Sequence, residues 1–198
     1  MTFITEKPPP NGRAAKCAGQ LEEHLYEAAV MLAVARWMFE LGAEKVCVHP
    51  DGMHAKQFDI CGWLKNEGFK RIAERGKTRE AGTYTRCHQT LEVEFMPGRG
   101  DVVADLKGRR VVVETKGGII NTRHPGQQSR LRRHLYEAVG MLLDGPNDAD
   151  RLIAAVPLHR ETQKIARRMA GRCLDAGIEI ALVSGKGDVQ LCAEDAQG

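Results

Sequence analysis

The sequence predicts an α/β fold in which a mixed central β-sheet is flanked by helices. Several segments carry apolar residues at helical spacing, and short runs rich in valine, isoleucine and alanine, typical of buried strands, lie between them. Turns that contain glycine or proline separate the two kinds of segment. The resulting order of helix, three strands, helix, strand, helix and strand implies a mixed sheet with helices packed against it.

One domain is expected, because a chain of 198 residues is long enough to bury a full hydrophobic core. The start of the chain contains Pro8, Pro9 and Pro10 followed by Asn11 and Gly12, a composition typical of irregular backbone. We therefore expect a flexible arm over residues 1–19 and a single domain over residues 20–198. The chain shows neither a signal peptide nor eighteen consecutive apolar residues, so we expect a cytoplasmic protein with no membrane partner.

Helices and strands are expected to alternate in the first half of the domain. A long helix should cover residues 20–41, with Gly42 as its stop, and a second helix should cover residues 53–66. Residues 75–85 are polar and contain two glycines, which favours a loop or a wide hairpin connection. The strands expected in this half cover residues 43–48, 70–74 and 89–95.

The second half begins with the clearest hairpin signal in the chain. Residues 101–106 and 109–116 are rich in valine and flank Lys107 and Gly108, a pair suited to a two-residue turn. The elements expected after this hairpin are a helix over residues 128–143, a strand over 152–156, a helix over 161–176 and a strand over 178–183.

The hairpin turn fixes which side chains face each other. If Lys107 and Gly108 form the turn, counting outward along the antiparallel ladder places Asp101 opposite Glu114, with β-carbons about 5 Å apart. Side chains alternate along a strand, so Lys116 should share their face, while the valines at intervening positions point into a core. We expect a charged face cleanly separated from an apolar face, and Asp105 opposite Arg110 as a cross-strand ion pair.

Two carboxylates at this distance repel each other unless a cation lies between them. Oxygen ligands suit a hard ion such as Mg²⁺, or Mn²⁺ in its place, which is commonly held by one or two carboxylates together with substrate phosphate. A nearby lysine could orient an attacking water and offset negative charge on the phosphorus. The pattern therefore favours phosphodiester chemistry.

The motif Gly100-Asp101, twelve residues, then Glu114-Thr115-Lys116 resembles the PD-(D/E)XK nuclease superfamily, which has the restriction-endonuclease-like fold. The resemblance covers roughly residues 53 to 156. It implies that Asp101 and Glu114 are metal ligands, that the backbone carbonyl of Thr115 is a further ligand, and that Lys116 orients the attacking water. The chain has glycine before Asp101 where the family has proline, and no subfamily pattern is matched.

Many members of that family carry a further acidic ligand on an early helix. Four residues compete for this role here: Glu23, Glu27, Asp59 and Glu67. We favour Glu27, because it lies on a helix that should be buried and a buried carboxylate needs a partner.

The expected function is that of a Mg²⁺-dependent endonuclease that hydrolyses phosphodiester bonds in DNA. One alternative is a catalytically inactive nucleic-acid-binding protein on the same fold, and another is an RNA-directed nuclease. A third is a surface hairpin whose Asp, Glu and Lys side chains only stay solvated. Two cuts in a duplex would favour a homodimer.

Basic residues are concentrated in the middle of the chain, with fifteen Lys and Arg against eight acidic residues from Arg99 to Arg172. A polyanion should therefore bind there. Aromatic residues make up only 5% of the chain, which favours duplex DNA over base stacking on single strands. The residues expected to contact nucleic acid are Arg123, His124, Gln128, Arg130, Arg132 and Arg133 near the motif, and Lys164 and Arg168 on the later helix.

Two further patterns carry weaker signals. The six cysteines form no C-x-x-C pair, and we interpret them as reduced thiols. Cys47, His49, His54 and Cys61 match no common zinc spacing, and we interpret this set as buried thiols beside a turn. The stretch HLYEA occurs at residues 24–28 and again at 134–138, either as a duplicated helix or by coincidence.

Overall fold

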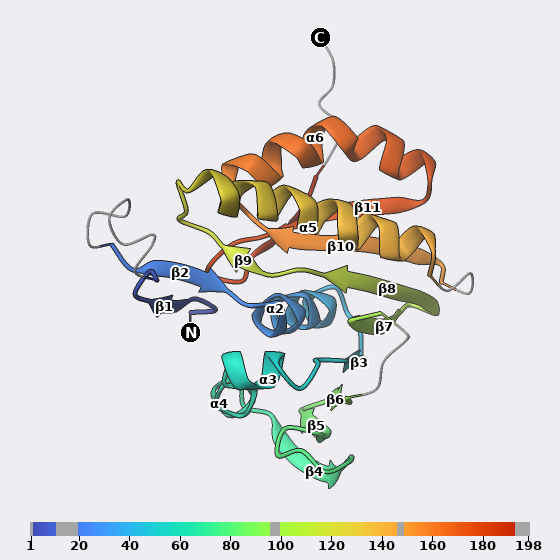
Figure 1. Cartoon of the computed structure of the whole chain (residues 1–198). Helices are drawn as coiled ribbons and strands as arrows, with labels where there is room; N and C mark the ends of the chain where they lie inside the picture. The colour runs from blue at the N-terminus through green and yellow to red at the C-terminus, as the bar shows by residue number, and fades with distance from the viewer. Residues whose placement is uncertain (1, 11–19, 96–99, 146–148, 193–198) are drawn as a thin grey trace.

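A computed structural model describes residues 2–10, 20–95, 100–145 and 149–192. Within these residues, nine strands form one mixed sheet in the order β12-β11-β10-β8-β7-β3-β6-β5-β4 (Figure 1). The strands β10 and β11, β10 and β8, and β3 and β6 pair in parallel, and the other neighbours are antiparallel. The predicted fold class, a mixed sheet flanked by helices, is confirmed.

The strands of the large sheet are β3 (Lys45–Val48), β4 (Lys70–Glu74), β5 (Gly82–Arg86), β6 (Gln89–Val93), β7 (Val102–Leu106), β8 (Arg109–Thr115), β10 (Arg151–Pro157), β11 (Ile178–Val183) and β12 (Val189–Leu191). The strand predictions at 70–74 and 178–183 agree with β4 and β11 to the residue. The strand β5 lies in a segment that we expected to be a loop or a wide hairpin connection. Its polar residues gave no strand pattern, and it is a strand because it pairs with β4 and β6.

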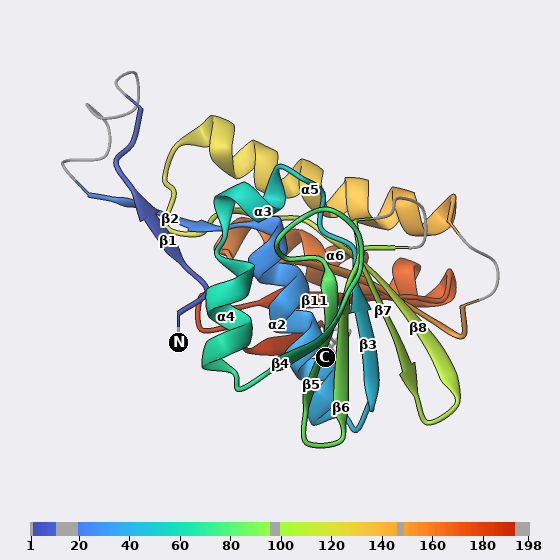
Figure 2. The ribbon, with the colours of Figure 1, turned by 90° about the horizontal axis from the view of Figure 1, so that it is seen from below.

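Helices cover the two faces of this sheet. On one face α2 (Glu27–Glu40) packs with α4 (Ile60–Asn66), and on the other lie α5 (Pro125–Leu143) and α6 (Arg160–Asp175) (Figures 1 and 2). Each face has its own hydrophobic core. The α2 core contains Val111 and Val113 of β8, whereas Val112 belongs to the core beneath α5 and α6.

The helix α2 is buried nearly all round, as its run of alanine, valine and methionine predicts. It ends where we expected, because Gly42 adopts a φ of +100°, a left-handed conformation that glycine takes readily. Its beginning was predicted wrongly. The residues before Glu27 form β2 (Glu22–Leu25), which pairs with β1 (Thr5–Lys7) and β9 (Gly118–Ile119) in a second, three-stranded sheet.

The first residues of the chain are not the flexible arm that we expected. Phe3 is fully buried, with its ring stacked on that of Phe58 and near that of Trp63, and Thr5–Lys7 is a strand. The prolines that follow mark irregular backbone but say nothing about burial of the residues before them. The remainder of the expected arm, residues 11–19, lies outside the described residues.

Two predicted helices have different bounds in the structure. The helix expected over residues 53–66 is split into α3 (His54–Gln57) and α4, because Asp59 caps α4 by accepting a hydrogen bond from the Gly62 backbone N–H at 3.0 Å. The helix α5 begins earlier than expected, with Pro125 in its first turn.

The β7–β8 hairpin has the predicted turn and register. Lys107 and Gly108 have φ values of +57° and +77°, as a mirror-type two-residue turn requires, and Leu106 pairs with Arg109. The predicted separation of a charged face from an apolar face is wrong. Because β8 lies between β7 and β10 in the sheet interior, Val112, on the same face as Glu114, is fully buried beneath α5.

The structure also bears on the membrane question. Among the described helices, none combines the length and the apolar character that a membrane crossing requires.

Candidate active site

The candidate site forms where β8 ends and β7 begins. The backbone N–H of Asp101 donates to the Val113 carbonyl at 3.0 Å, and the Asp101 carbonyl accepts from the His49 N–H at 2.8 Å. The β7–β8 register ends with Val102 opposite Val113, and these bonds hold Asp101 just beyond that pair, close enough to Glu114 for their charges to interact. The predicted direct pairing of Asp101 with Glu114 stays a prediction. Gly100 has a φ of +89°, a left-handed conformation that glycine adopts readily and proline cannot.

The Asp101 carboxylate is fixed against the end of β8. Its Oδ2 accepts hydrogen bonds from the Thr115 backbone N–H at 2.7 Å and from the Thr115 hydroxyl at 2.8 Å. Among the described residues, these hydrogen bonds engage Oδ2, so Oδ1 is available for a cation. Thr115 itself is fully buried, which makes its position rigid.

Glu114 is held in an environment that does not favour its charge. Its side chain belongs to a residue only 7% exposed, and Oε2 is buried without a hydrogen-bond partner in the described part of the chain. Burial first, and then the negative charges of Asp101 and Glu27, raise the pKa of Glu114 to about 7, against the lowering effect of Lys116. A buried oxygen without a partner is unfavourable, and a bound cation would relieve this.

Lys116 and Glu27 complete the cluster from two different elements. The Lys116 Nζ donates to Glu27 Oε1 at 3.2 Å, and both side chains are largely shielded from solvent. Burial lowers the pKa of Lys116, but the carboxylates of Glu27, Asp101 and Glu114 outweigh this effect, so the net shift is upward. Lys116 is therefore a cation at neutral pH.

A glycine allows these two elements to approach. A β-carbon on Gly117 would lie 2.6 Å from the Glu27 backbone nitrogen and 2.7 Å from the Leu25 carbonyl, closer than real contacts permit. Gly117 thus lets the end of β8 lie against the start of α2, where the helix dipole favours the Glu27 carboxylate.

Of the four acidic residues that compete for the third position, the structure brings only Glu27 to this cluster. Glu23 lies in β2, Asp59 caps α4, and Glu67 forms an ion pair with Arg86 at 3.0 Å. Glu27 is thus the candidate that lies at the cluster, and its role as a metal ligand stays a prediction.

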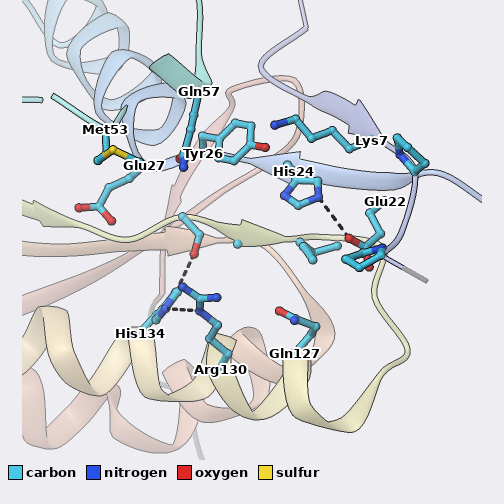
Figure 3. Close-up of a pocket in the computed structure, with 15 residues that line it drawn as sticks. Lys7, Glu22, His24, Tyr26, Glu27, Met53, Gln57, Gln127, Arg130 and His134 are labelled. Carbon is cyan, nitrogen blue, oxygen red and sulfur yellow. Dashed lines mark hydrogen bonds and ion pairs between the residues drawn. The ribbon is translucent and has the colours of Figure 1, made fainter. Parts of the chain in front are cut away.

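A polar pocket of about 500 Å³ lies beside Glu27 and Gly117 (Figure 3). Its walls come from the small β1–β2–β9 sheet and from the first half of α5. On α5, the His134 Nδ1 lies 2.7 Å from the Gly117 carbonyl, and its Nε2 accepts a hydrogen bond from the Arg130 Nε at 3.2 Å. Burial lowers the pKa of His134, so this ring is neutral at pH 7. The polar side chains that line the pocket are Lys7, Glu22, His24, Tyr26, Glu27, Gln57, Gln127, Arg130 and His134.

The sequence analysis did not identify most of the residues that line this pocket, but the repeated stretch HLYEA could have pointed to two of them. The first copy spans the junction of β2 and α2, and the second lies within α5, so it is not a duplicated helix. His24 and His134, the first residues of the two copies, nevertheless line the same pocket (Figure 3).

The residues expected to contact nucleic acid fall into two groups. Near the site, Arg123 and Arg133 are exposed and Arg130 lines the pocket, whereas Arg132 forms an ion pair with Glu161 at 2.9 Å. The Nδ1 of His124 accepts from the Gly126 N–H and caps α5, and the Gln128 amide donates to the Thr122 carbonyl.

The second group lies on α6. Lys164 and Arg168 are exposed, but α6 packs on β11, two strands away from β8 in the sheet. The structure therefore does not bring Lys164 and Arg168 to the candidate site.

Comparisons with known proteins return nothing: no family model, no curated protein and no solved structure matches this chain. A functional assignment accordingly depends on the geometry of the chain itself.

The residues present fit a hard divalent cation. The cluster offers carboxylate oxygens from Asp101 and Glu114, one of which is buried without a partner in the described ranges, and the backbone carbonyl of Thr115, the last residue of β8. Oxygen donors of this kind suit Mg²⁺ or Mn²⁺ rather than a softer metal.

Proposed function

We propose that this protein is a Mg²⁺- or Mn²⁺-dependent nuclease of the PD-(D/E)XK type that hydrolyses phosphodiester bonds in DNA. The observation that carries the proposal is the buried Oε2 of Glu114, which has no hydrogen-bond partner among the residues that the structure describes, beside Asp101 and Lys116. A solvated surface hairpin would leave these groups exposed to water, and Glu114 is not.

In this proposal Asp101, Glu114 and the Thr115 carbonyl hold the ion, with Glu27 as a further acidic group beside them. When bound, the ion supplies positive charge that polarises the scissile phosphate and stabilises the developing negative charge. Lys116 orients the attacking water and offsets charge on the phosphorus. Glu27 keeps the Lys116 ammonium aimed at the site through their hydrogen bond.

The surroundings of the cluster support a nucleic-acid substrate. Arg130 and Lys7 border the pocket beside Glu27, and Arg123 and Arg133, just before and within α5, are exposed. Arginine and lysine in such positions bind successive phosphates without reading the bases. We infer that the DNA backbone lies along the first half of α5.

The test is a cleavage assay on plasmid and duplex oligonucleotides with Mg²⁺, Mn²⁺ or Ca²⁺. We expect cleavage with the first two ions, and binding without cleavage with Ca²⁺. Lys116→Ala should abolish cleavage and keep the fold, whereas Arg109→Ala, an exposed cation on the same hairpin, should retain activity. Circular dichroism of each variant checks the fold.

Two other outcomes would replace the proposal. If neither DNA nor RNA is cut with any ion, yet duplex DNA binds and Asp101→Asn binds more tightly, the chain is a binding protein on which the acids only repel phosphate. If RNA is cut in preference to DNA under the same conditions, the substrate class is wrong and the roles of Asp101, Glu114 and Lys116 stand.

A further inference from the structure

A second group of potential metal ligands lies on the strands next to Asp101. Cys47, His49 and Glu94 each offer one ligand atom, and these atoms all lie within 4.8 Å of one another. The sequence pattern suggested a different group of four residues, namely Cys47, His49, His54 and Cys61. Cys61 belongs to α4, and the side chain of His54 is outside those that the structure describes.

Strand register explains why residues so far apart in sequence meet. The strands β3 and β6 run in parallel with Cys47 opposite Glu92, and the Glu94 N–H donates to the Val48 carbonyl at 3.0 Å. Side chains two residues apart share a face, so His49 and Glu94 lie level with each other beyond Cys47. No local spacing in the sequence could indicate this.

His49 carries an independent sign of a missing ligand. Its Nδ1 is buried and has no hydrogen-bond partner in the described part of the chain. Its backbone is fixed, because the His49 N–H donates to the Asp101 carbonyl at 2.8 Å. Nδ1 is one of the two ring nitrogens through which His49 can bind a metal, and a metal–nitrogen bond there would give it the partner that the described residues do not supply.

The surroundings leave space and provide support. A cavity of about 300 Å³ lies over the cluster, and its lining includes Val103, Asp105 and Arg110 of the neighbouring β7 and β8. Arg75 forms an ion pair with Glu94 through Oε1, and it also contacts Glu92 at 2.7 Å. The guanidinium thus orients the Glu94 carboxylate from outside, as groups around metal ligands usually do.

We propose that Cys47, His49 and Glu94 bind a transition-metal ion of the zinc class, with the fourth position open to the cavity. Thiolate, imidazole and carboxylate are the donors of tetrahedral zinc sites, whose metal–ligand bonds of about 2.0–2.3 Å place neighbouring ligands roughly 3–4 Å apart. Small side-chain adjustments bring the three atoms into that range. A sulfur and a nitrogen donor disfavour Mg²⁺, so the two clusters select different ions.

This site would join β3 to β6 and, through His49, hold the backbone at Asp101. The proposal does not depend on nuclease activity, since it concerns binding of a different metal to different side chains.

The test uses metal-free protein without a histidine tag, titrated with Co²⁺ and followed by absorption spectroscopy. We expect one equivalent to give visible bands of tetrahedral cobalt and a near-ultraviolet band from thiolate-to-cobalt charge transfer. Zn²⁺ should displace the cobalt and abolish both signals. A protein that gives no charge-transfer band with stoichiometric Co²⁺ would overturn the proposal.

Matched variants locate the ligand. Cys47→Ser should remove the charge-transfer band, and Cys61→Ser, a half-buried cysteine on α4, should keep it. His49→Asn and Glu94→Gln should each weaken Co²⁺ binding by roughly tenfold or more, and they serve if Cys47→Ser does not fold. A band that survives Cys47→Ser, or normal affinity in both other variants, would assign the metal elsewhere.

A further variant separates this proposal from the nuclease. Asp101→Asn together with Glu114→Gln should keep the cobalt spectrum unchanged while eliminating cleavage. If that double variant loses the spectrum, the cobalt occupies the acidic site and the proposed second site does not exist. If the wild-type protein does not cleave DNA but gives the cobalt spectrum, the proposed nuclease function is wrong and the proposed Cys47 metal site still holds.

Discussion

The acidic cluster at the end of β8 and the Cys47 cluster on β3 and β6 are neighbours with different chemistry. The first combines carboxylates with the Lys116 ammonium and lies between the start of α2 and the first half of α5. The second mixes sulfur, nitrogen and oxygen on strands beyond the cover of α5 and α6, which contact β8, β10 and β11 (Figure 1). In the two proposals together, one sheet presents a hard-ion site and a soft-ion site on neighbouring strands.

The largest expected difference between the two clusters is in catalysis. Glu114→Gln should lower the rate of DNA cleavage by roughly a hundredfold or more, because it removes a charged ligand of the Mg²⁺ ion. Glu94→Gln, the same change in the other cluster, should leave the rate within a few-fold of the wild type. Single-turnover cleavage at saturating Mg²⁺ measures both, and equal losses would mean that the clusters act as one site.

In metal-free protein, the free energy of unfolding should depend on pH because Glu114 ionises. Its pKa is raised from 4.5 to about 7 in the folded state, first by burial and then by Asp101. An acid with a raised pKa disfavours its own ionisation, so the fold loses stability as pH rises from about 4.5 to 7. Glu114→Gln should therefore be more stable than wild type at pH 8, by on the order of 1–3 kcal/mol, and similar at pH 4.5.

Urea unfolding in the presence of EDTA measures this difference. Adding Mn²⁺ at pH 8 should stabilise the wild type and not Glu114→Gln, since the ion compensates the charge that burial penalises. A variant that is equally stabilised at both pH values would show that the effect comes from packing rather than from ionisation.

The affinity for DNA should depend more on basic residues beside the acidic cluster than on basic residues farther away. Arg130→Ala, in the pocket beside Glu27, should weaken duplex binding by roughly three- to tenfold and lower the salt dependence by about one ion. Arg168→Ala on α6 should have a smaller effect. Fluorescence anisotropy in Ca²⁺ at several salt concentrations measures both, and a larger effect of Arg168 would move the DNA path to α6.

The smallest expected effect concerns cysteine reactivity without metal. Burial first, and then Glu94 and Glu92, raise the pKa of the Cys47 thiol to about 12. Alkylation at pH 8 should be at least roughly a hundredfold slower at Cys47 than at the exposed Cys87. Mass spectrometry after iodoacetamide treatment in EDTA measures the rates, and comparable labelling would show that Cys47 is neither buried nor near the acids.

Local patterns in the sequence predicted much of the fold correctly. Alternating valines and the Lys107-Gly108 turn predicted the hairpin and its register, because a two-residue turn allows only one pairing of the strands that it connects. Runs of apolar residues with a glycine stop predicted most helices and buried strands. The short strands β1, β9 and β12 were missed, since a segment of two or three residues has no periodicity and becomes a strand only through its partners.

The part of the candidate site that lies within one hairpin was also predictable from the sequence. Asp101 and Glu114 belong to one hairpin, so local register was enough to place them together. Glu27 lies far away in sequence, and the contact with Lys116 required Gly117 to let β8 approach α2. His134, His24 and Lys7 were not identified, because each reaches the pocket from a separate element.

By itself, the sequence determined the hairpin, the position of two acids and a lysine at its open end, and the mixed α/β class, because each follows from interactions between residues close together in the chain. Only the tertiary structure decided that α5 would bury the face of Glu114, that Glu27 would join Lys116, and that Glu94 would meet Cys47 and His49. The physical reason is that burial and long-range strand order depend on the packing of the whole domain, which no local spacing encodes.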